Sequence, residues 1–321
     1  MSGMSTSNMD ALIRSELWSK QLKTVLEDEL MATGYVNWLS EFPDGNTFTI
    51  PSIGEATVRD YVEDTGVVYD SLDTAEFQMT ITEYLSSATY ITEKAKQDSF
   101  YMSQLTSSFV PKMQRAISEK IETDVLDLAR TGQTISGTNT INGADHRFVA
   151  SGTNQVITTA DFAKALYALK KANVPQTNLV AIVDPSVEYT INTLTNLSNV
   201  SNNPMWEGII ATGIASGMRF LKNIYGFDVY TSNYLAGAGA AGAGAETVDS
   251  VTVADGVANV FFSAAGGDIN PFMGAWRQMP KVDGEYNKDF QREEHIVTAR
   301  YGLSLYRPEN LVVVLSDSNR V

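Results

Sequence analysis

The stretch Lys94–Gly132 reads KAKQDSFYMSQLTSSFVPKMQRAISEKIETDVLDLARTG and predicts an unusually long helix, which we call the spine helix. Its apolar residues recur at steps of three and four, and so share one side of a helix: Val110, Met113, Ile117, Ile121, Val125 and Leu128. A helix over the whole stretch would be on the order of 50 Å long, the width of a domain. Pro111 predicts a break or bend, with a regular helix from Lys112 to Arg130. Such a helix suits either the core of an ordinary α+β protein or a more extended molecule, and the flanking segments distinguish the two.

Composition places the chain among folded proteins. It has 321 residues, enough for two or three compact units, of which 43% are hydrophobic and 19% charged. The net charge of −15 comes from 38 acidic and 23 basic residues. Proteins that bind nucleic acid through phosphate contacts normally show the reverse balance. A broad basic surface is therefore not expected, although a local basic patch in the folded chain stays open.

Three absences narrow the class of protein further. The chain has no cysteine, which excludes disulfides, thiolate metal sites and cysteine nucleophiles, and fits synthesis in a reducing cytoplasm. No apolar run approaches about 18 residues, and the N-terminus lacks the basic and apolar parts of a secretory signal. We therefore expect no contact with a membrane.

The segment 46–92 predicts a long two-stranded hairpin. Phe48 and Ile50 alternate with polar residues, and so do Phe77, Met79 and Ile81 later in the segment. Arms of about 14–18 residues would reach about 45–60 Å, whereas a compact domain of about 120 residues has a radius of gyration of only about 14 Å. An isolated ribbon of two strands is marginal in water. The hairpin therefore needs a neighbouring molecule, which favours a protein that assembles.

The remaining segments differ in their patterns of apolar residues. Residues 1–45 resemble an arm, with an amphipathic helix predicted within Met9–Thr33. Helix and strand patterns alternate over 155–275, which predicts a separate α/β unit. Two late strands follow, His295–Arg307 with alternating apolar residues and Leu311–Leu315, which is apolar throughout and expected to be buried on both faces. We expect both late strands to form the sheet beneath the spine helix.

The motifs associated with enzymes are weak. Gly237, Gly239 and Gly242 match the dinucleotide-binding pattern, but no amphipathic helix follows them, so we predict a surface loop. The two histidines, His146 and His295, stand outside any metal-binding or hydrolase motif, and the serine-elbow spacing is absent. Four carboxylates indicate a solvated hairpin tip: Glu63, Asp64, Asp70 and Asp73. We therefore predict no enzymatic activity, no cofactor and no metal.

The order of these parts resembles the major capsid proteins of tailed bacteriophages, which have the Hong Kong 97-type (Johnson) fold. TFTIPSIGEATVRDY and FQMTITEYLSSATYITEKAKQDS resemble the two strands of that family's extended loop, the second running into the spine helix. ADFAKALYALKKANVPQTNLVAIVDPSVEYTI and IYGFDVYTSNYL resemble its axial domain, and ARYGLSLYRPENLVVVL resembles the closing strands of its peripheral domain. The likeness covers nearly the whole chain, and it rests on the order of the motifs.

The resemblance implies an α+β fold in four parts: an N-terminal arm (1–45), an extended loop (46–92), a peripheral domain with the spine helix (93–154 and 276–321) and an axial domain (155–275). It implies a structural protein of the virion that assembles in the host cytoplasm. Hexamers and pentamers of the chain would tile an icosahedral shell around double-stranded DNA, without sequence-specific binding. A separate scaffolding protein and a portal are the further partners it implies, and a decoration protein stays open.

The chain differs from some family members in two features, and each leads to an expectation. Some members crosslink through a lysine of the extended loop, but no lysine lies between Lys23 and Lys94, so we expect no such crosslinking. Some carry a long N-terminal scaffolding segment, whereas only about 45 residues precede the hairpin here. For that reason we expect the scaffolding protein to be a separate chain.

The residues proposed for subunit interfaces lie on the hairpin and the arm: Trp18, Trp38, Phe48, Ile50, Arg59 and Tyr61. The alternative for each of them is local packing within one subunit. Two alternatives to the whole hypothesis also stay open. One is an encapsulin-like nanocompartment, a shell of the same fold that encloses cargo enzymes, and the other is an α/β hydrolase that is a monomer or a small oligomer.

Overall fold

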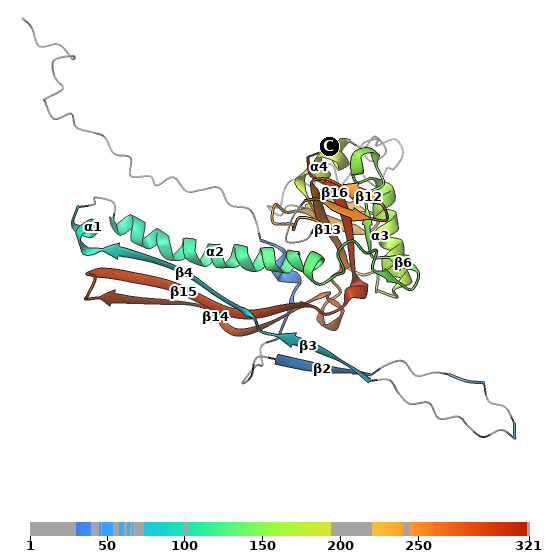
Figure 1. Cartoon of the computed structure of the whole chain (residues 1–321), viewed down its shortest axis with the longest axis horizontal. Helices are drawn as coiled ribbons and strands as arrows, with labels where there is room; N and C mark the ends of the chain where they lie inside the picture. The colour runs from blue at the N-terminus through green and yellow to red at the C-terminus, as the bar shows by residue number, and fades with distance from the viewer. Residues whose placement is uncertain are drawn as a thin grey trace, which may run out of the picture.

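The computed structural model describes residues 30–39, 45, 47–53, 58–60, 63–64, 66, 74–98, 102–193, 220–239 and 244–319. The helix predicted within Met9–Thr33 therefore lies almost wholly outside the described residues. The described chain is elongated, with a long helix beside a long sheet, a compact α/β unit at one end, and a thin hairpin projecting away from both (Figure 1). No helix among the described residues is both long and apolar enough to cross a membrane.

The spine helix is α2, Met102–Thr131, and it follows a short helix α1, Glu93–Asp98. Five of the six predicted stripe residues are buried, and Val110 is partly buried, so the predicted stripe is confirmed. The predicted break at Pro111 is wrong, because α2 continues through it. The Pro111 ring is exposed, so the turn that lacks its N–H bond faces solvent. The helix ends where the Gly132 amide bonds the Leu128 carbonyl at 2.9 Å.

The first sheet lies against the spine helix and has the order β1-β14-β15-β4. Its strands are β1 (Asn37–Leu39), β14 (Phe272–Asn287), β15 (Arg292–Leu305) and β4 (Glu83–Thr92). β4 and β15 pair antiparallel, and β1 adds a short parallel edge to β14. Side chains of β4 alternate between half-buried and exposed, because only one face of this sheet is covered by α2.

The hairpin consists of β2 (Thr47–Ile53) and β3 (Thr74–Thr80), paired antiparallel from Thr47↔Thr80 to Ile53↔Thr74. After Ile81 and Thr82 the chain enters β4 and joins the sheet under the spine helix. The segment 46–92 therefore divides in two, a free ribbon up to Thr80 and a sheet strand beyond it. The second predicted strand is in fact two strands, β3 and β4, and they belong to different sheets.

The α/β unit is built on a sheet of order β7-β16-β13-β8-β10-β9. Its strands are β7 (Arg147–Val149), β16 (Leu311–Asp317), β13 (Gly256–Ser263), β8 (Leu179–Val183), β10 (Phe227–Thr231) and β9 (Phe220–Ile224). One face packs on helices α3 (Thr159–Lys171) and α4 (Pro185–Thr193), and the other faces the C-terminal half of α2. Shorter elements are β5 (Thr140–Ile141), β6 (Ala144–Asp145), β11 (Glu246–Val248), β12 (Val251–Val253), and 3-10 turns at Ala32–Tyr35, Thr153–Gln155, Gly267–Ile269 and Pro308–Asn310.

The position of β16 corrects one prediction. Every residue of β16 is buried, as predicted, but the strand lies between β7 and β13 and not in the sheet beneath the spine helix. Val313 packs in the same cluster as the spine helix, whereas Val312 and Val314 pack in the cluster of α3. A strand that is apolar on both faces needs a layer on each side, and only the α/β sheet provides two. Leu311–Leu315 was therefore placed wrongly, and the division of 93–154 with 276–321 from 155–275 stays a prediction.

Candidate assembly interfaces

The hairpin β2–β3 projects from the body, with its far end away from the other described elements (Figure 1). Residues described near that end are exposed, and the side chain of Val58 is 94% exposed. Two carboxylates there, Glu63 and Asp64, are also exposed, as predicted for a solvated tip. A two-stranded ribbon in this position contributes little to the core of its own chain. Its length is available for contact with another molecule.

At its base the hairpin is attached to the sheet by a small apolar cluster. Met79 and Ile81 pack with Met273 and Ala275, and the Phe77 ring meets the edge of the Tyr306 ring at 5.0 Å between centroids. Gly302 of β15 lies directly beneath the crossing chain. A Cβ atom there would lie 2.9 Å from the Thr80 carbonyl oxygen and 3.0 Å from the Ile81 Cα. The hairpin therefore leaves the body at a point where only glycine fits.

The N-terminal segment Met31–Leu39, which we call the arm root, lies between the spine helix and β14. The carboxylate of Glu122 accepts hydrogen bonds from three backbone amides in turn, those of Met31 (2.9 Å), Ala32 (2.7 Å) and Thr33 (3.0 Å). At the other end of the root, the Trp38 ring stacks on Trp276 at 4.6 Å and 20°. Contacts at both of its ends therefore hold the arm root in place.

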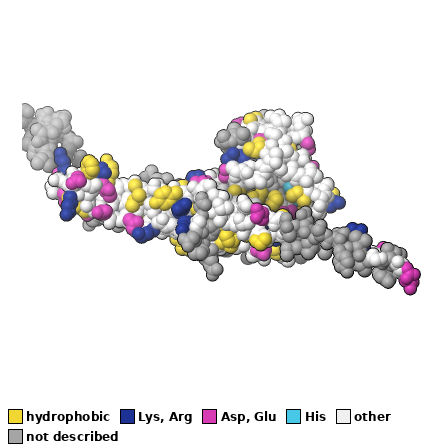
Figure 2. Space-filling model, turned by 60° about the horizontal axis from the view of Figure 1, so that its bottom comes forward, with side chains coloured by type: hydrophobic (Ala, Val, Ile, Leu, Met, Phe, Trp, Pro, Cys, Tyr) yellow, Lys and Arg dark blue, Asp and Glu magenta, His cyan; other side chains and the backbone are white. Residues whose placement is uncertain are grey.

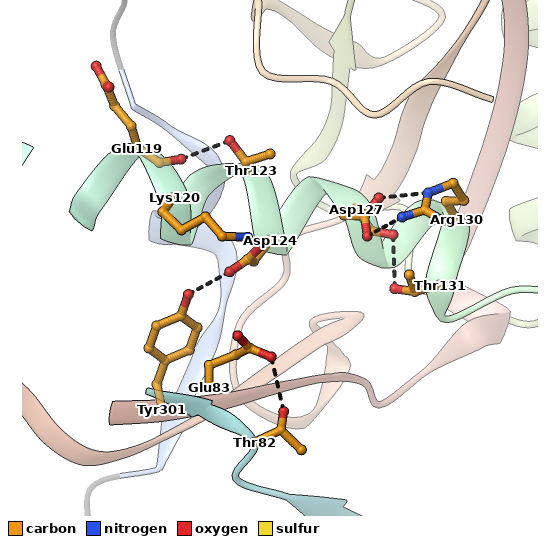
Figure 3. Close-up of polar contacts among 10 residues, drawn as sticks. All are labelled: Thr82, Glu83, Glu119, Lys120, Thr123, Asp124, Asp127, Arg130, Thr131 and Tyr301. Carbon is orange, nitrogen blue, oxygen red and sulfur yellow. Dashed lines mark hydrogen bonds and ion pairs between the residues drawn. The ribbon is translucent and has the colours of Figure 1, made fainter. Parts of the chain in front are cut away.

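Figure 3 shows polar contacts within the spine helix and one contact between the helix and β15. The Tyr301 hydroxyl on β15 donates to Asp124 Oδ2 at 2.6 Å, and Lys120 forms an ion pair with the same carboxylate. One turn further on, Arg130 makes a two-pronged contact with Asp127. Burial, together with the hydrogen bond to Asp124, raises the pKa of the Tyr301 hydroxyl well above its usual range. Tyr301 therefore stays a neutral donor at physiological pH.

Exposed apolar side chains concentrate on the sheet of the spine helix. Tyr84 and Tyr90 lie on β4, and the others lie on β14, β15 and the turn between them: Met279, Val282, Tyr286, Phe290 and Ile296. Figure 2 shows apolar patches interleaved with acidic and basic side chains along this elongated part. Arg292 stacks its guanidinium over Tyr90 at 4.5 Å from the ring centroid. A surface on which exposed apolar side chains lie between charged ones is typical of contacts with a further protein chain.

The two histidines and the glycine stretch singled out in the sequence can now be placed. No group of three or more His, Asp or Glu side chains in the described part of the chain lies close enough to bind a metal ion. His146 is buried, and its Nδ1 lies 3.1 Å from the Ala144 carbonyl oxygen. The glycine stretch is not the predicted surface loop in its first part, because Ala238 is fully buried and its carbonyl accepts a bond from Arg147 at 2.8 Å. Gly242 lies outside the described residues.

The six residues predicted for interfaces fall into three groups. Trp18 and Tyr61 lie outside the described residues. Trp38 and Ile50 contact their own chain, Trp38 on Trp276 and Ile50 beside the cluster at the hairpin base. Phe48 and Arg59 lie on the hairpin, with Phe48 opposite Met79 and Arg59 exposed. The structure brings none of the described four into a common site, and their role between subunits stays a prediction.

Sequence reasoning missed Glu122, which is fully buried. A signal for it existed, because Glu122 begins a second buried line on α2 that continues four and seven residues later with Leu126 and Ala129. A carboxylate in such a line must find donors from another segment. The identity of those donors, backbone amides about ninety residues earlier in the chain, could not be read from the spacing.

The fold and its projections define a class of protein. The spine helix lies on an open sheet, the hairpin projects from the core of its own chain, and the arm root is held against the body. These features together are typical of a structural subunit that packs with neighbouring subunits.

Comparisons with known proteins agree. The sequence profile of a family described as phage capsid protein matches residues 74–314, and the chain belongs to that family. It is a capsid shell protein of the virion with the Hong Kong 97-type fold, and its role is structural.

Solved structures show the same fold at low sequence identity. A structure from Mycobacterium phage Che8 is 17% identical with a TM-score of 0.68, covering 97% of this chain and 99% of that one. The capsid structure of cyanophage P-SCSP1u is 15% identical with a TM-score of 0.71, covering 97% and 94%. The mature capsid of bacteriophage PhiM1 is 12% identical with a TM-score of 0.69, covering 99% and 96%. No curated protein matched the sequence.

Proposed function

We propose that this chain forms hexamers and pentamers that close an icosahedral shell around double-stranded DNA. The observation that carries the proposal is the β2–β3 hairpin, which projects from the body and whose described residues beyond the base are mostly exposed. A closed shell would cover such a projection and the open edges of the spine sheet with neighbouring subunits, whereas a monomer would expose them. Membership of the phage capsid family supports the same conclusion.

In this proposal the hairpin lies on an adjacent subunit and the N-terminal arm reaches another. Phe48, Arg59 and Tyr61 would contact the neighbour along the hairpin, and Trp18 would do so along the arm. Trp38 and Ile50 would act beside these contacts, because the structure already packs them within their own chain. The net charge of −15 fits DNA that is confined by the shell rather than bound by sequence. A scaffolding protein, a portal and a decoration protein complete the proposed set of partners, with assembly in the host cytoplasm.

A shortened hairpin tests the role of the projection. Residues Ile53 and Thr74 form the last described pair of the ribbon, so a two-residue Asn-Gly turn can replace 54–73 without disturbing the pairs below it. We expect the variant to keep the thermal unfolding midpoint of the parent within about 2 °C, because the removed part lies beyond the cluster at the hairpin base. We also expect it to form no closed shells in electron micrographs. Normal shells from the shortened chain would contradict the proposal.

The contents of the shell need a separate measurement. Purified particles should protect double-stranded DNA from nuclease and show five- and sixfold capsomers by cryo-electron microscopy. Uniform particles that contain protein cargo and no protected DNA would favour a nanocompartment instead. A species of 35 kDa alone, at high concentration and with scaffolding protein present, would contradict a shell of either kind.

A further inference from the structure

Glu122 is a charged residue on the buried side of the spine helix, where apolar packing alone does not account for a carboxylate. The residue is 0% exposed and lies on the side of α2 that faces the arm root. Oε1 accepts from the Met31 and Ala32 amides, and Oε2 accepts from the Thr33 amide. These three donors lie at the start of a 3-10 turn, Ala32–Tyr35, whose first amides have no partner inside the turn. The carboxylate therefore accepts hydrogen bonds from amides that the turn leaves unpaired, and these amides replace the water that the buried carboxylate has lost.

The charge of Glu122 has no cationic partner among the described residues. An ionised carboxylate taken out of water is costly unless hydrogen bonds replace its hydration, and bonds from N–H groups to a charged acceptor are about twice as strong as neutral ones. The three amides supply that replacement. If the arm root left its place, the carboxylate and three amides would lose their partners together. The position of the root is therefore strongly coupled to Glu122.

The residues of the arm root after Thr33 make further contacts with the body of the subunit. Tyr35 packs edge-on against Phe262 of the α/β sheet at 5.3 Å between ring centroids. Beyond it, β1 pairs with β14 over three residues, and the Trp38 ring covers Gly274, where a Cβ atom would lie 2.6 Å from the ring. The root is thus attached to the spine helix, the α/β sheet and the spine sheet in succession. The described chain begins at Leu30, next to the end of the root that Glu122 holds.

We propose that Glu122 is a positioning residue for assembly, which determines where the N-terminal arm leaves the subunit and so which neighbour the arm can reach. This inference rests on the proposed function, in which the arm contacts another subunit. The proposal requires no contact between Glu122 and a second copy of the chain. Glu122 acts through the arm root, and its loss releases the arm while the helix, sheets and hairpin keep their structure.

The test combines local hydrogen exchange with assembly in the full-length chain. Glu122→Gln keeps the size of the side chain but turns one acceptor into a donor that faces the Thr33 amide. Glu122→Asp keeps the charge and withdraws the carboxylate from the amides. Asp127→Asn is the matched control, because it removes one carboxylate from the same helix at a site paired with Arg130 and remote from the arm root. Exchange is followed by mass spectrometry over residues 31–39 and over 311–317 as a core reference.

We expect exchange at 31–33 to become about tenfold faster in Glu122→Gln, with an increase also in Glu122→Asp, while 311–317 exchanges as in the parent. Both variants should form fewer closed shells than Asp127→Asn under the same conditions. Unchanged exchange at 31–33 in both variants would overturn the inference, and so would faster exchange with normal shell formation. If Glu122→Gln does not fold, Glu122→Asp decides by the same two measurements.

Failure of the proposed function gives a different result. In that case the parent chain itself forms no shells with its scaffolding protein, although exchange at 31–33 still responds to Glu122. This result would overturn the assembly role and leave only a local anchor. Shells from the parent together with normal shells from both Glu122 variants would leave the proposed function standing and overturn the inference alone.

Discussion

Tyr301 and Asp124 are 177 residues apart in the chain and are joined by a hydrogen bond of 2.6 Å between the phenol oxygen and Oδ2. The bond connects the second half of β15 to the C-terminal third of the spine helix. Because Tyr301 is fully buried and its ring also meets Trp276 edge-on at 5.6 Å, the hydroxyl has a defined direction. This pair links the helix to the sheet, and it can be tested without changing the apolar packing.

Tyr301→Phe removes the donor and keeps the ring. We expect the free energy of unfolding to fall by about 1.5–3 kcal/mol, the range for a hydrogen bond to a charged group, as measured by urea denaturation at pH 7. Tyr234→Phe is the matched control, since its hydroxyl also donates to a carboxylate of the spine helix, Glu119, but at 3.1 Å and at a less buried site. We expect about 1 kcal/mol or less there. Equal losses would show that the Tyr301 bond has no special role.

Gly302→Ala should disturb the base of the hairpin. The added Cβ would meet the Thr80 carbonyl and the Ile81 Cα, both backbone atoms that cannot turn aside. We expect a loss of about 1–3 kcal/mol in the free energy of unfolding, the usual cost of overpacking, and faster hydrogen exchange in β3. Gly137→Ala is the control, because its nearest neighbour would be a side-chain atom at an ordinary 3.4 Å. If the two variants are equally stable, the chain at Thr80–Ile81 must be able to move away without cost.

Arg147 joins the spine helix to the α/β unit. This fully buried guanidinium donates to the Ala129 carbonyl at 3.0 Å and to the Ala238 carbonyl at 2.8 Å. Burial lowers the pKa of Arg147 below its usual range, although the side chain remains charged.

Arg147→Met leaves both of these carbonyls without their donor, and each unsatisfied buried acceptor costs about 1–3 kcal/mol. We therefore expect a loss of about 2–4 kcal/mol, less any gain from removing a buried charge, in guanidinium chloride denaturation. Arg130→Met makes the same change at a partly exposed ion pair with Asp127, and should cost about 1 kcal/mol or less. A smaller loss for Arg147→Met than for Arg130→Met would contradict the proposed connection.

His146 should make stability depend on pH. Burial lowers the pKa of its imidazole below the ordinary 6.5, so the folded chain resists the proton that the unfolded chain accepts. The unfolded state then binds more protons below about pH 6.5, and the free energy of unfolding falls as pH drops through that value. His146→Asn retains a donor near the Nδ1 position and has no titration. The difference in stability between variant and parent should be constant from pH 8 to about 7 and shift in favour of the variant below about 6.5. A difference that does not change with pH would contradict this account.

Local periodicity accounts for much of what could be predicted. The stripe of α2 and the all-buried character of β16 follow from the spacing of apolar residues, because each pattern reflects the geometry of a single element. The hairpin β2–β3 was predicted from alternation as well, but its second strand was predicted to continue beyond Thr80, where β3 ends. Alternation continues from β3 into β4 without a strong turn signal, so the point at which the chain changes sheets was not visible.

The continuity of α2 through Pro111 shows where a local rule fails. A proline inside a helix removes one hydrogen bond, which alone favours a break. The packing of the later turns, from Met113 to Leu128, offsets that loss, and the exposed ring avoids any clash with the sheet. Local preference was outweighed by tertiary burial.

By itself, the sequence determined the kinds of element and their order along the chain, from which a capsid subunit with a projecting hairpin was inferred. Only the tertiary structure decided that β16 lies between β7 and β13, that Gly302 passes beneath Thr80, and that Glu122 binds the amides of Met31–Thr33. The physical reason is sequence separation. Periodicity records which side of an element is buried, whereas partners tens to hundreds of residues away are selected by the space and the unpaired donors that remain once the elements pack.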